Sequence, residues 1–88
     1  MQADKVKVSR LIKTARGQLD GILKMIEDDR YCIDIANQLM ASEAILKRAN
    51  KEILAAHMAH CVKTAVAGED ADQKIGEIIA VIDKAIDM

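Results

Sequence analysis

The fold is decided by the stretch from Tyr31 to Ala65, which reads YCIDIANQLMASEAILKRANKEILAAHMAHCVKTA and contains neither proline nor glycine. Its apolar residues recur at helical spacing, so it predicts one continuous helix. At ~1.5 Å per residue this helix would be roughly 50 Å long, which is too long to stand alone in a small monomer. The stretch therefore predicts a helical protein in which one long helix packs against others.

A second helix is predicted before this stretch, from about residue 4 to 28. Its apolar residues fall at steps of three and four and form one stripe along the helix. The stripe consists of Val8, Ile12, Ala15, Leu19, Ile22 and Ile26. The sequence Asp28-Asp29-Arg30 then interrupts the pattern as a tight connection, and Asp29 is a candidate N-cap for the long helix.

A third helix is predicted from about residue 70 to 87. Gly68 indicates the end of the long helix, and Asp70 followed by Gln73 resembles a capping box. The apolar stripe of this helix consists of Ile75, Ile79, Ile82 and Ile86. The whole pattern predicts an all-α protomer, a single domain over residues 1–88 with helices at about 4–28, 31–66 and 70–87.

The composition excludes several classes of protein. Hydrophobic residues make up 51% of the 88 residues and aromatic residues 1%, so the core is aliphatic, and 31% charged residues favour amphipathic helices over disorder. No apolar run approaches the roughly 20 residues of a membrane span, and the first residues lack the apolar segment of a secretion signal. Domains of this size often gain stability from oligomerisation. We therefore expect a cytoplasmic helical oligomer.

Charge is unevenly distributed, although the formal net charge is −1. Residues 1–16 hold five basic residues against one acid, and residues 69–88 hold six acids against two lysines. A basic start is compatible with a nucleic-acid-binding face, but a net charge near zero is not that of a strong polycation. Asp20 lies four residues from both Arg16 and Lys24, so ion pairs within the helix are an alternative role for these charges.

Three residues of the long helix carry donor atoms for metal or thiol chemistry: Cys32, His57 and Cys61. His57 and Cys61 are spaced i, i+4 and share one face, whereas Cys32 lies within about 20° of that face but ~37 Å away along the axis. One continuous helix cannot close these residues on one ion. Two helices packed antiparallel and crossing near residues 44–47 would place Cys32 of one protomer beside His57 and Cys61 of the other.

The residues alone leave three interpretations of this set. Two thiolates and one imidazole form a soft, low-coordinate set that suits Cu(I) and could hold Zn(II) with a fourth ligand. Two thiols facing each other across an interface could instead be oxidised or bridged by sulfur. The third interpretation is that both cysteines are simply buried, which is common for free cysteine.

Four segments resemble the copper-sensing repressors of the copper-sensitive operon repressor family. They are Gly17-Gln18-Leu19-Asp20-Gly21-Ile22, Met25-Ile26-Glu27, Arg30-Tyr31-Cys32 and His57-Met58-Ala59-His60-Cys61-Val62, and the likeness extends over about residues 10–66. The resemblance implies that Cys32, His57 and Cys61 bind one Cu(I) per protomer in trigonal geometry across a dimer interface. It also implies a dimer that is an antiparallel four-helix bundle, assembled as a dimer of dimers.

The same resemblance implies a transcriptional repressor and not an enzyme, one that binds operator DNA when free of copper and releases it when Cu(I) binds. Tyr31 and Glu77 match the pair that couples the bound histidine to the third helix, which fits the need of a ligating imidazole for a partner on its other nitrogen. Relatives that sense nickel or cobalt use an N-terminal histidine, and formaldehyde sensors use proline where this chain has Gln2. Persulfide sensors lack the histidine ligand, so His57 favours copper.

The departures from the family fall on the DNA-binding side. Many members carry Arg or Lys where this chain has Leu11 and Thr14, and often Arg where it has Asp20, and fewer basic residues weaken the counterion release that dominates DNA affinity. The candidates for phosphate contact are Arg10, Lys13, Arg16, Lys47, Arg48 and Lys51. The alternative function is thus a family-derived protein that binds Cu(I) or reacts with persulfides and thiols, with DNA binding weakened or lost.

Overall fold

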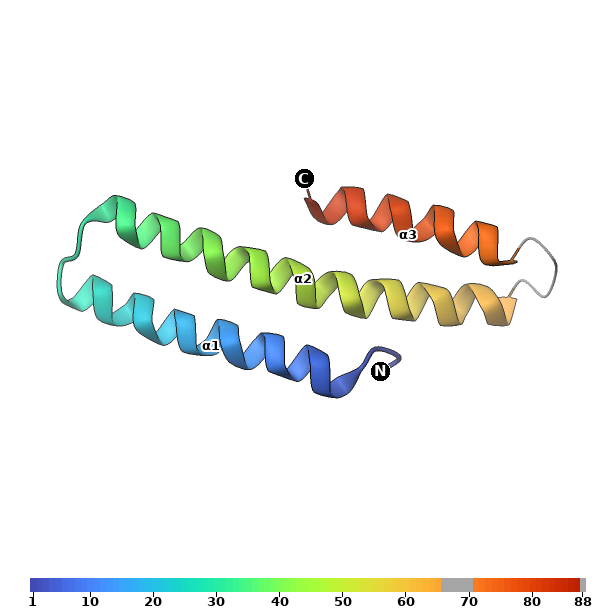
Figure 1. The fold of residues 1–88 in the computed structure, drawn as a ribbon, viewed down its shortest axis with the longest axis horizontal. Helices are drawn as coiled ribbons and strands as arrows, with labels where there is room; N and C mark the ends of the chain where they lie inside the picture. The colour runs from blue at the N-terminus through green and yellow to red at the C-terminus, as the bar shows by residue number, and fades with distance from the viewer. Residues whose placement is uncertain (66–70, 88) are drawn as a thin grey trace.

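The computed structural model describes residues 1–65 and 71–87, which form three helices (Figure 1). Helix α1 runs from Lys5 to Glu27, α2 from Cys32 to Ala65 and α3 from Ala71 to Asp87. The predicted all-α class with three helices is therefore confirmed, and the described ranges contain no strand. The predicted stop at Gly68 and the capping box that starts at Asp70 lie outside the described residues.

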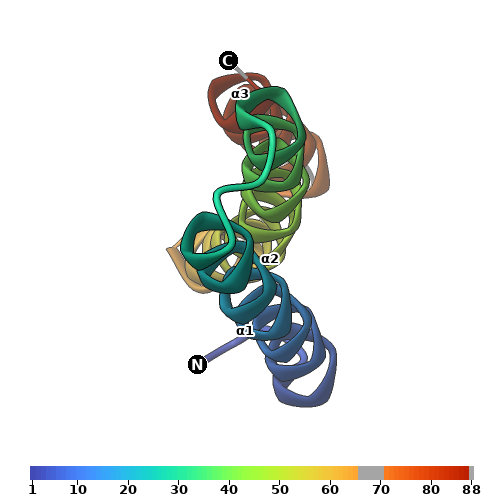
Figure 2. The ribbon, with the colours of Figure 1, turned by 90° about the vertical axis from the view of Figure 1, so that its left-hand side faces the viewer.

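The three helices form a layer that is one helix thick. Helix α2 lies in the middle, with α1 along its N-terminal half and α3 along its C-terminal half, and α1 and α3 do not contact each other (Figures 1 and 2). The Cα atoms extend over 58 × 25 × 12 Å, and their radius of gyration is 17.2 Å. A compact chain of this length would have a radius of gyration of about 12 Å. The described helices of a single chain therefore leave both broad faces of α2 without cover.

Helices α1 and α2 pack through small and aliphatic side chains. Ala15 on α1 and Ser42 and Ala49 on α2 are almost fully buried, and such small residues allow the two helix axes to approach closely. The Ser42 hydroxyl donates a hydrogen bond of 2.9 Å to Oε1 of Gln18, which satisfies the only buried polar side chain of the described core. Val8 and Ile22 complete the buried line of α1.

The predicted apolar stripe of α1 is divided between two surfaces. Val8, Ala15 and Ile22 are buried against α2, whereas Ile12 remains 44% exposed and Leu19 43% exposed. Such exposure of large aliphatic side chains in regular rows is typical of an interaction surface. The stripe is therefore wider than α2 alone can cover.

The connection between α1 and α2 corrects one prediction. Asp29 has φ = 50° and follows the last turn of α1, where its N–H donates to the Ile26 carbonyl (3.1 Å) and the Arg30 N–H donates to the Met25 carbonyl (3.0 Å). These two bonds form a Schellman motif, which closes a helix C-terminus through a left-handed residue. The prediction of Asp29 as N-cap of the long helix is wrong: it terminates α1, and the first hydrogen bond of α2 runs from Ile35 N–H to the Tyr31 carbonyl (3.2 Å).

Replacing Asp29 by glycine is expected to stabilise the protein by about 0.5–1 kcal/mol, because glycine adopts the left-handed conformation without the steric cost of a Cβ atom. Denaturant unfolding at one fixed protein concentration measures this gain. Asp28→Gly is the matched control, since Asp28 has φ = −86° and gains nothing from glycine. An equal gain in stability in both variants would contradict the assignment of Asp29 as the left-handed residue that closes α1.

Helix α3 packs on α2 through its own apolar stripe. Ile75 is buried, and Ile79 and Ile82 are half-buried. The side chain of Ile86 lies outside the described ones. No helix in the described part of the chain is long and apolar enough to cross a membrane.

Candidate functional site

Helix α2 is unbroken, so it separates the predicted metal ligands within one chain. Cys32 is its first residue and carries an exposed, free thiol, and His57 is exposed 25 residues later, ~37 Å along the axis. Cys61 lies one turn beyond His57 on the same helix, but its side chain is outside the described ones. Among the described side chains, no three His, Cys, Asp or Glu residues are arranged to hold a metal ion. The structure of one chain does not bring Cys32 and His57 together.

Exposed aliphatic residues follow the line of α2 that joins Cys32 to His57. Successive residues of an α-helix are rotated by about 100° around its axis. Around the axis of α2, Leu39 and Leu46 are therefore rotated by about 40–60° from the buried Ser42, toward the same side as Cys32 and His57. Leu39 is 47% exposed and Leu46 43% exposed. Glu43 and Asn50 share this line and are also exposed, and no element in the described part of the chain covers any of these residues.

The exposed aliphatic residues of α1 lie on the same side of the layer. Ile12, Leu19 and Leu23 are offset by about 40–80° from the buried Ala15, in the same rotational sense as the exposed residues of α2. Because α1 and α2 are antiparallel neighbours, equal offsets from their shared contact place side chains on the same broad face. We call this surface the open apolar face; it comprises Ile12, Leu19, Leu23, Leu39 and Leu46.

The two residues expected to couple the ligands to α3 lie outside α2, one near each of its ends. Tyr31 precedes Cys32 and is 61% exposed. Glu77 is exposed on α3 and lines a groove of about 580 Å³ between α2 and α3, together with Met58, the neighbour of His57. Leu54, Ile78, Val81 and Ile82 complete the groove. Glu77 therefore lies near the His57 end of α2 and far from Tyr31 of its own chain.

The predicted phosphate contacts occupy two regions. On α1, Arg10 and Lys13 are exposed and line a shallow hollow on the outer side of the helix with Lys5, Val6, Ser9 and Thr14. The Thr14 hydroxyl donates to the Arg10 carbonyl (2.9 Å), so this side chain is hydrogen-bonded to its own helix. Arg16 and Asp20 are exposed on the same helix, and Leu11 is half-buried.

On α2, Arg48 is exposed, whereas Lys47 and Lys51 are half-exposed. Arg48 lies about 180° around α2 from Leu39, and Arg10 lies about 180° around α1 from Leu19. These two arginines are therefore on the broad face opposite the open apolar face. A second copy that covers the open apolar face would leave them accessible.

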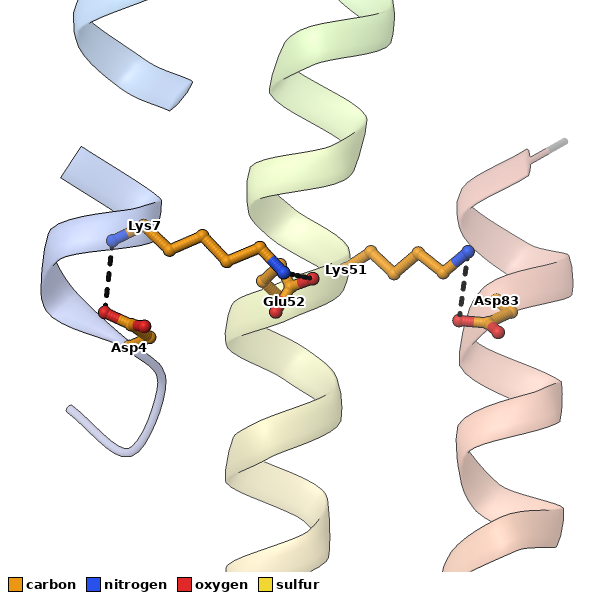
Figure 3. Close-up of polar contacts among 5 residues, drawn as sticks. All are labelled: Asp4, Lys7, Lys51, Glu52 and Asp83. Atoms are coloured by element: carbon orange, nitrogen blue, oxygen red, sulfur yellow. Dashed lines mark hydrogen bonds and ion pairs between the residues drawn. The ribbon is translucent and has the colours of Figure 1, made fainter. Parts of the chain in front are cut away.

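Two ion pairs between helices were not predicted. Lys7 Nζ lies 2.9 Å from Glu52 Oε1 and joins α1 to α2, and Lys51 Nζ lies 3.7 Å from Asp83 Oδ1 and joins α2 to α3 (Figure 3). Asp4 caps α1 beside the first pair by accepting from the N–H groups of Val6 and Lys7. The sequence carries no signal for either pair, because their partners are far apart in the chain and only i, i+3 and i, i+4 pairs can be recognised from spacing.

Comparison with known proteins identifies the family. Residues 4–84 match the family model of the metal-sensitive transcriptional repressors, which covers nearly the whole chain. The chain belongs to this family. The resemblance to metal-sensing repressors is confirmed, and the expectation that the chain is not an enzyme is confirmed with it, since the members of the family are transcriptional repressors.

Several relatives in this family of repressors are named as copper sensors. The copper-sensing transcriptional repressor CsoR of Mycobacterium ulcerans is 44% identical over 68 residues, which cover 77% of this chain and 58% of that protein. CsoR of Bacillus subtilis is 37% identical over 81 residues, 92% of this chain and 80% of that protein. The copper-sensing repressor RicR of Mycobacterium tuberculosis is 38% identical over 80 residues, which cover 89% of this chain and 83% of that protein. The chain thus spans less than two thirds of the M. ulcerans protein, and no solved structure matches it significantly.

Proposed function

We propose that this family member is a cytoplasmic Cu(I)-responsive repressor, which binds operator DNA in the absence of copper and releases it when Cu(I) binds between two subunits. The observation that carries the proposal is the unbroken α2, which exposes Cys32 at its start and His57 near its end on one line. The naming of several relatives as copper-sensing repressors supports the choice of metal.

Cys32 of one protomer, with His57 and Cys61 of the other, would hold one Cu(I) per protomer. Two thiolates and a neutral imidazole form a soft donor set of low coordination number, which fits Cu(I) better than a hard divalent ion. Bound Cu(I) would supply only coordinate bonds to these residues, which would link the two subunits. Cys32 and His57 are both exposed in a single chain, as residues that meet across an interface must be before the partner is present.

The open apolar face supports an antiparallel dimer. Leu39 and Leu46 lie between Cys32 and His57 on α2, so two α2 helices that cross near residues 44–47 would bury these leucines and bring the ligands together at both ends. Burial of α1 residues such as Leu19 from both copies would complete a four-helix bundle. The proposed tetramer would pair two such dimers.

The position of Glu77 supports a coupling between the proposed metal ligands and α3. Glu77 lines the groove beside Met58, one residue from the proposed ligand His57, and it lies on the helix whose Asp83 forms an ion pair with Lys51 of α2. A carboxylate that accepts a hydrogen bond from a ligating imidazole fixes the orientation of the ring. Tyr31 of the other protomer would lie at the same end of the bundle. In this mechanism His57 and Glu77 transmit ligand binding to α3 and lower the affinity for DNA.

Fluorescence anisotropy of a labelled duplex from the region upstream of the protein's own gene tests the function. Wild-type protein is expected to bind at a stated salt concentration and to release the duplex when Cu(I) is added. His57→Ala is expected to retain some Cu(I) binding through both cysteines but to release the duplex less completely. For this coupling to exist, Cu(I) and the duplex must each have different affinities for the two states of the protein.

Equal release by the wild type and His57→Ala would contradict the role of His57. If the protein takes up Cu(I) but binds no duplex at low salt, the repressor proposal fails. The alternative, a Cu(I)-binding or persulfide-reactive protein with lost DNA binding, would then be favoured, with Leu11, Thr14 and Asp20 as its cause.

A further inference from the structure

Two consecutive residues of α2 form ion pairs with the two different helices that flank it. Glu52 accepts from Lys7 of α1, and its neighbour Lys51 extends toward Asp83 of α3 (Figure 3). The two pairs differ in geometry: the first is a hydrogen-bonded pair at 2.9 Å, whereas the second has an Nζ–Oδ1 distance of 3.7 Å, beyond hydrogen-bond length. Lys51 is thus attracted to Asp83 without being fixed to it.

Asp83 is an unusual acceptor because one of its oxygens is enclosed. The side chain as a whole is 36% exposed, but Oδ1 is shielded from solvent and accepts no hydrogen bond from any described residue. A shielded carboxylate oxygen without a hydrogen bond is costly unless a positive charge compensates it. The ion-pair partner found for Asp83 in the described part of the chain is Lys51.

Lys51 belongs to the group of α2 bases expected to contact DNA, and it differs from the other two. Among the described residues, Lys47 and Arg48 form no ion pair, whereas Lys51 faces an acid of α3. The Lys51 side chain is also 42% exposed, so another anion has access to its ammonium group. The same lysine can therefore be neutralised either by Asp83 or by a phosphate.

We propose that Asp83 competes with DNA phosphate for Lys51, so that α3 sets how much positive charge α2 offers to DNA. The inference rests on the DNA binding of the proposed function and adds a regulatory contact within the chain. When α3 is docked as in this structure, Asp83 neutralises Lys51 and reduces the number of phosphate contacts. When the contact opens, Lys51 joins Arg48 as a phosphate-binding residue and Asp83 Oδ1 becomes hydrated.

Salt-dependent anisotropy of wild type, Asp83→Asn, Lys51→Met and the double variant tests the proposal on one duplex without added metal. Asp83→Asn keeps the shape of the side chain and removes the competing charge. Each Lys51 that gains a phosphate steepens the slope of log affinity against log salt by roughly 0.9, so a fourfold rise in salt costs this variant roughly 3.5-fold more affinity than wild type per added contact. Lys51→Met in the Asp83→Asn background is expected to abolish this gain.

Asp72→Asn is the matched control, since it removes the same charge from an exposed position at the other end of α3. The proposal is overturned if Asp83→Asn and Asp72→Asn change affinity and slope equally, or if the gain persists without Lys51. If wild type and every variant fail to bind duplex at low salt, the proposed repressor function fails as well. Binding by wild type with no special effect of Asp83 refutes the competition alone.

Discussion

Replacement of Cys32 by serine is expected to lower the affinity for Cu(I) by more than ~100-fold. Even residues that only orient a ligand commonly contribute 10–100-fold to metal affinity, and loss of one of three direct donors should cost more. Competition with a chromophoric Cu(I) chelator measures the change. Met40→Leu is the control, because it removes an exposed sulfur from the same helix outside the proposed donor set.

Mixing two inactive variants tests whether the site is shared between subunits. Cys32→Ser and Cys61→Ser should each lack both sites as homodimers. A mixed dimer would restore one site, because the Cys61→Ser protomer supplies Cys32 and the Cys32→Ser protomer supplies His57 and Cys61. Recovery of one tight Cu(I) per mixed dimer is expected. No recovery after verified exchange of subunits would refute the intersubunit arrangement.

Leu46→Glu is expected to convert the assembled protein into monomers. If α2 helices cross near residues 44–47, the two introduced carboxylates would face each other next to the symmetry axis, away from water and without a cation. An uncompensated buried charge costs about 3–5 kcal/mol, which weakens association by more than ~100-fold. Sedimentation velocity over a range of protein concentrations measures the oligomeric state, and high-affinity Cu(I) binding should be lost in parallel.

The control for this experiment is Val6→Glu. Val6 is an exposed aliphatic residue on the outer side of α1, away from the open apolar face, so the same change in chemistry should leave the assembly intact. If Leu46→Glu sediments as the wild type does, the open apolar face is not the subunit interface. The antiparallel crossing and the shared site would then both be wrong.

The sequence predicted the helices because each has a strong periodic signal. Between Tyr31 and Ala65 nothing interrupts the pattern, and α2 is accordingly continuous. The connection before it was harder to predict, because Asp29 favours helix N-caps as well as left-handed turns and its neighbours decide between them. The Schellman bonds to Met25 and Ile26 depend on where α1 ends, which periodicity does not fix.

The sequence predicted only those features of the candidate site that depend on the positions of residues along one helix. The spacing of Cys32 and His57 gives their shared line and their separation on one helix, and α2 is unbroken between them. Exposure of Leu39 and Leu46 on that line could not be derived, because apolar periodicity does not distinguish burial by α1 from burial by a second copy. The contact between Lys51 and Asp83 depends on how α3 is docked, and no local spacing encodes it.

The thinness of the layer bears on how the protein is made in the cell. If a second copy covers the open apolar face, as proposed, a newly synthesised chain can align its helices but encloses its exposed aliphatic side chains only after it meets another copy. The rate of that step rises with the concentration of the chain, and stability measured on the isolated protein depends on concentration in the same way. In such an assembly, a chain made in excess of its partners would stay open to proteases, and the lifetime of the protein would depend on its assembly.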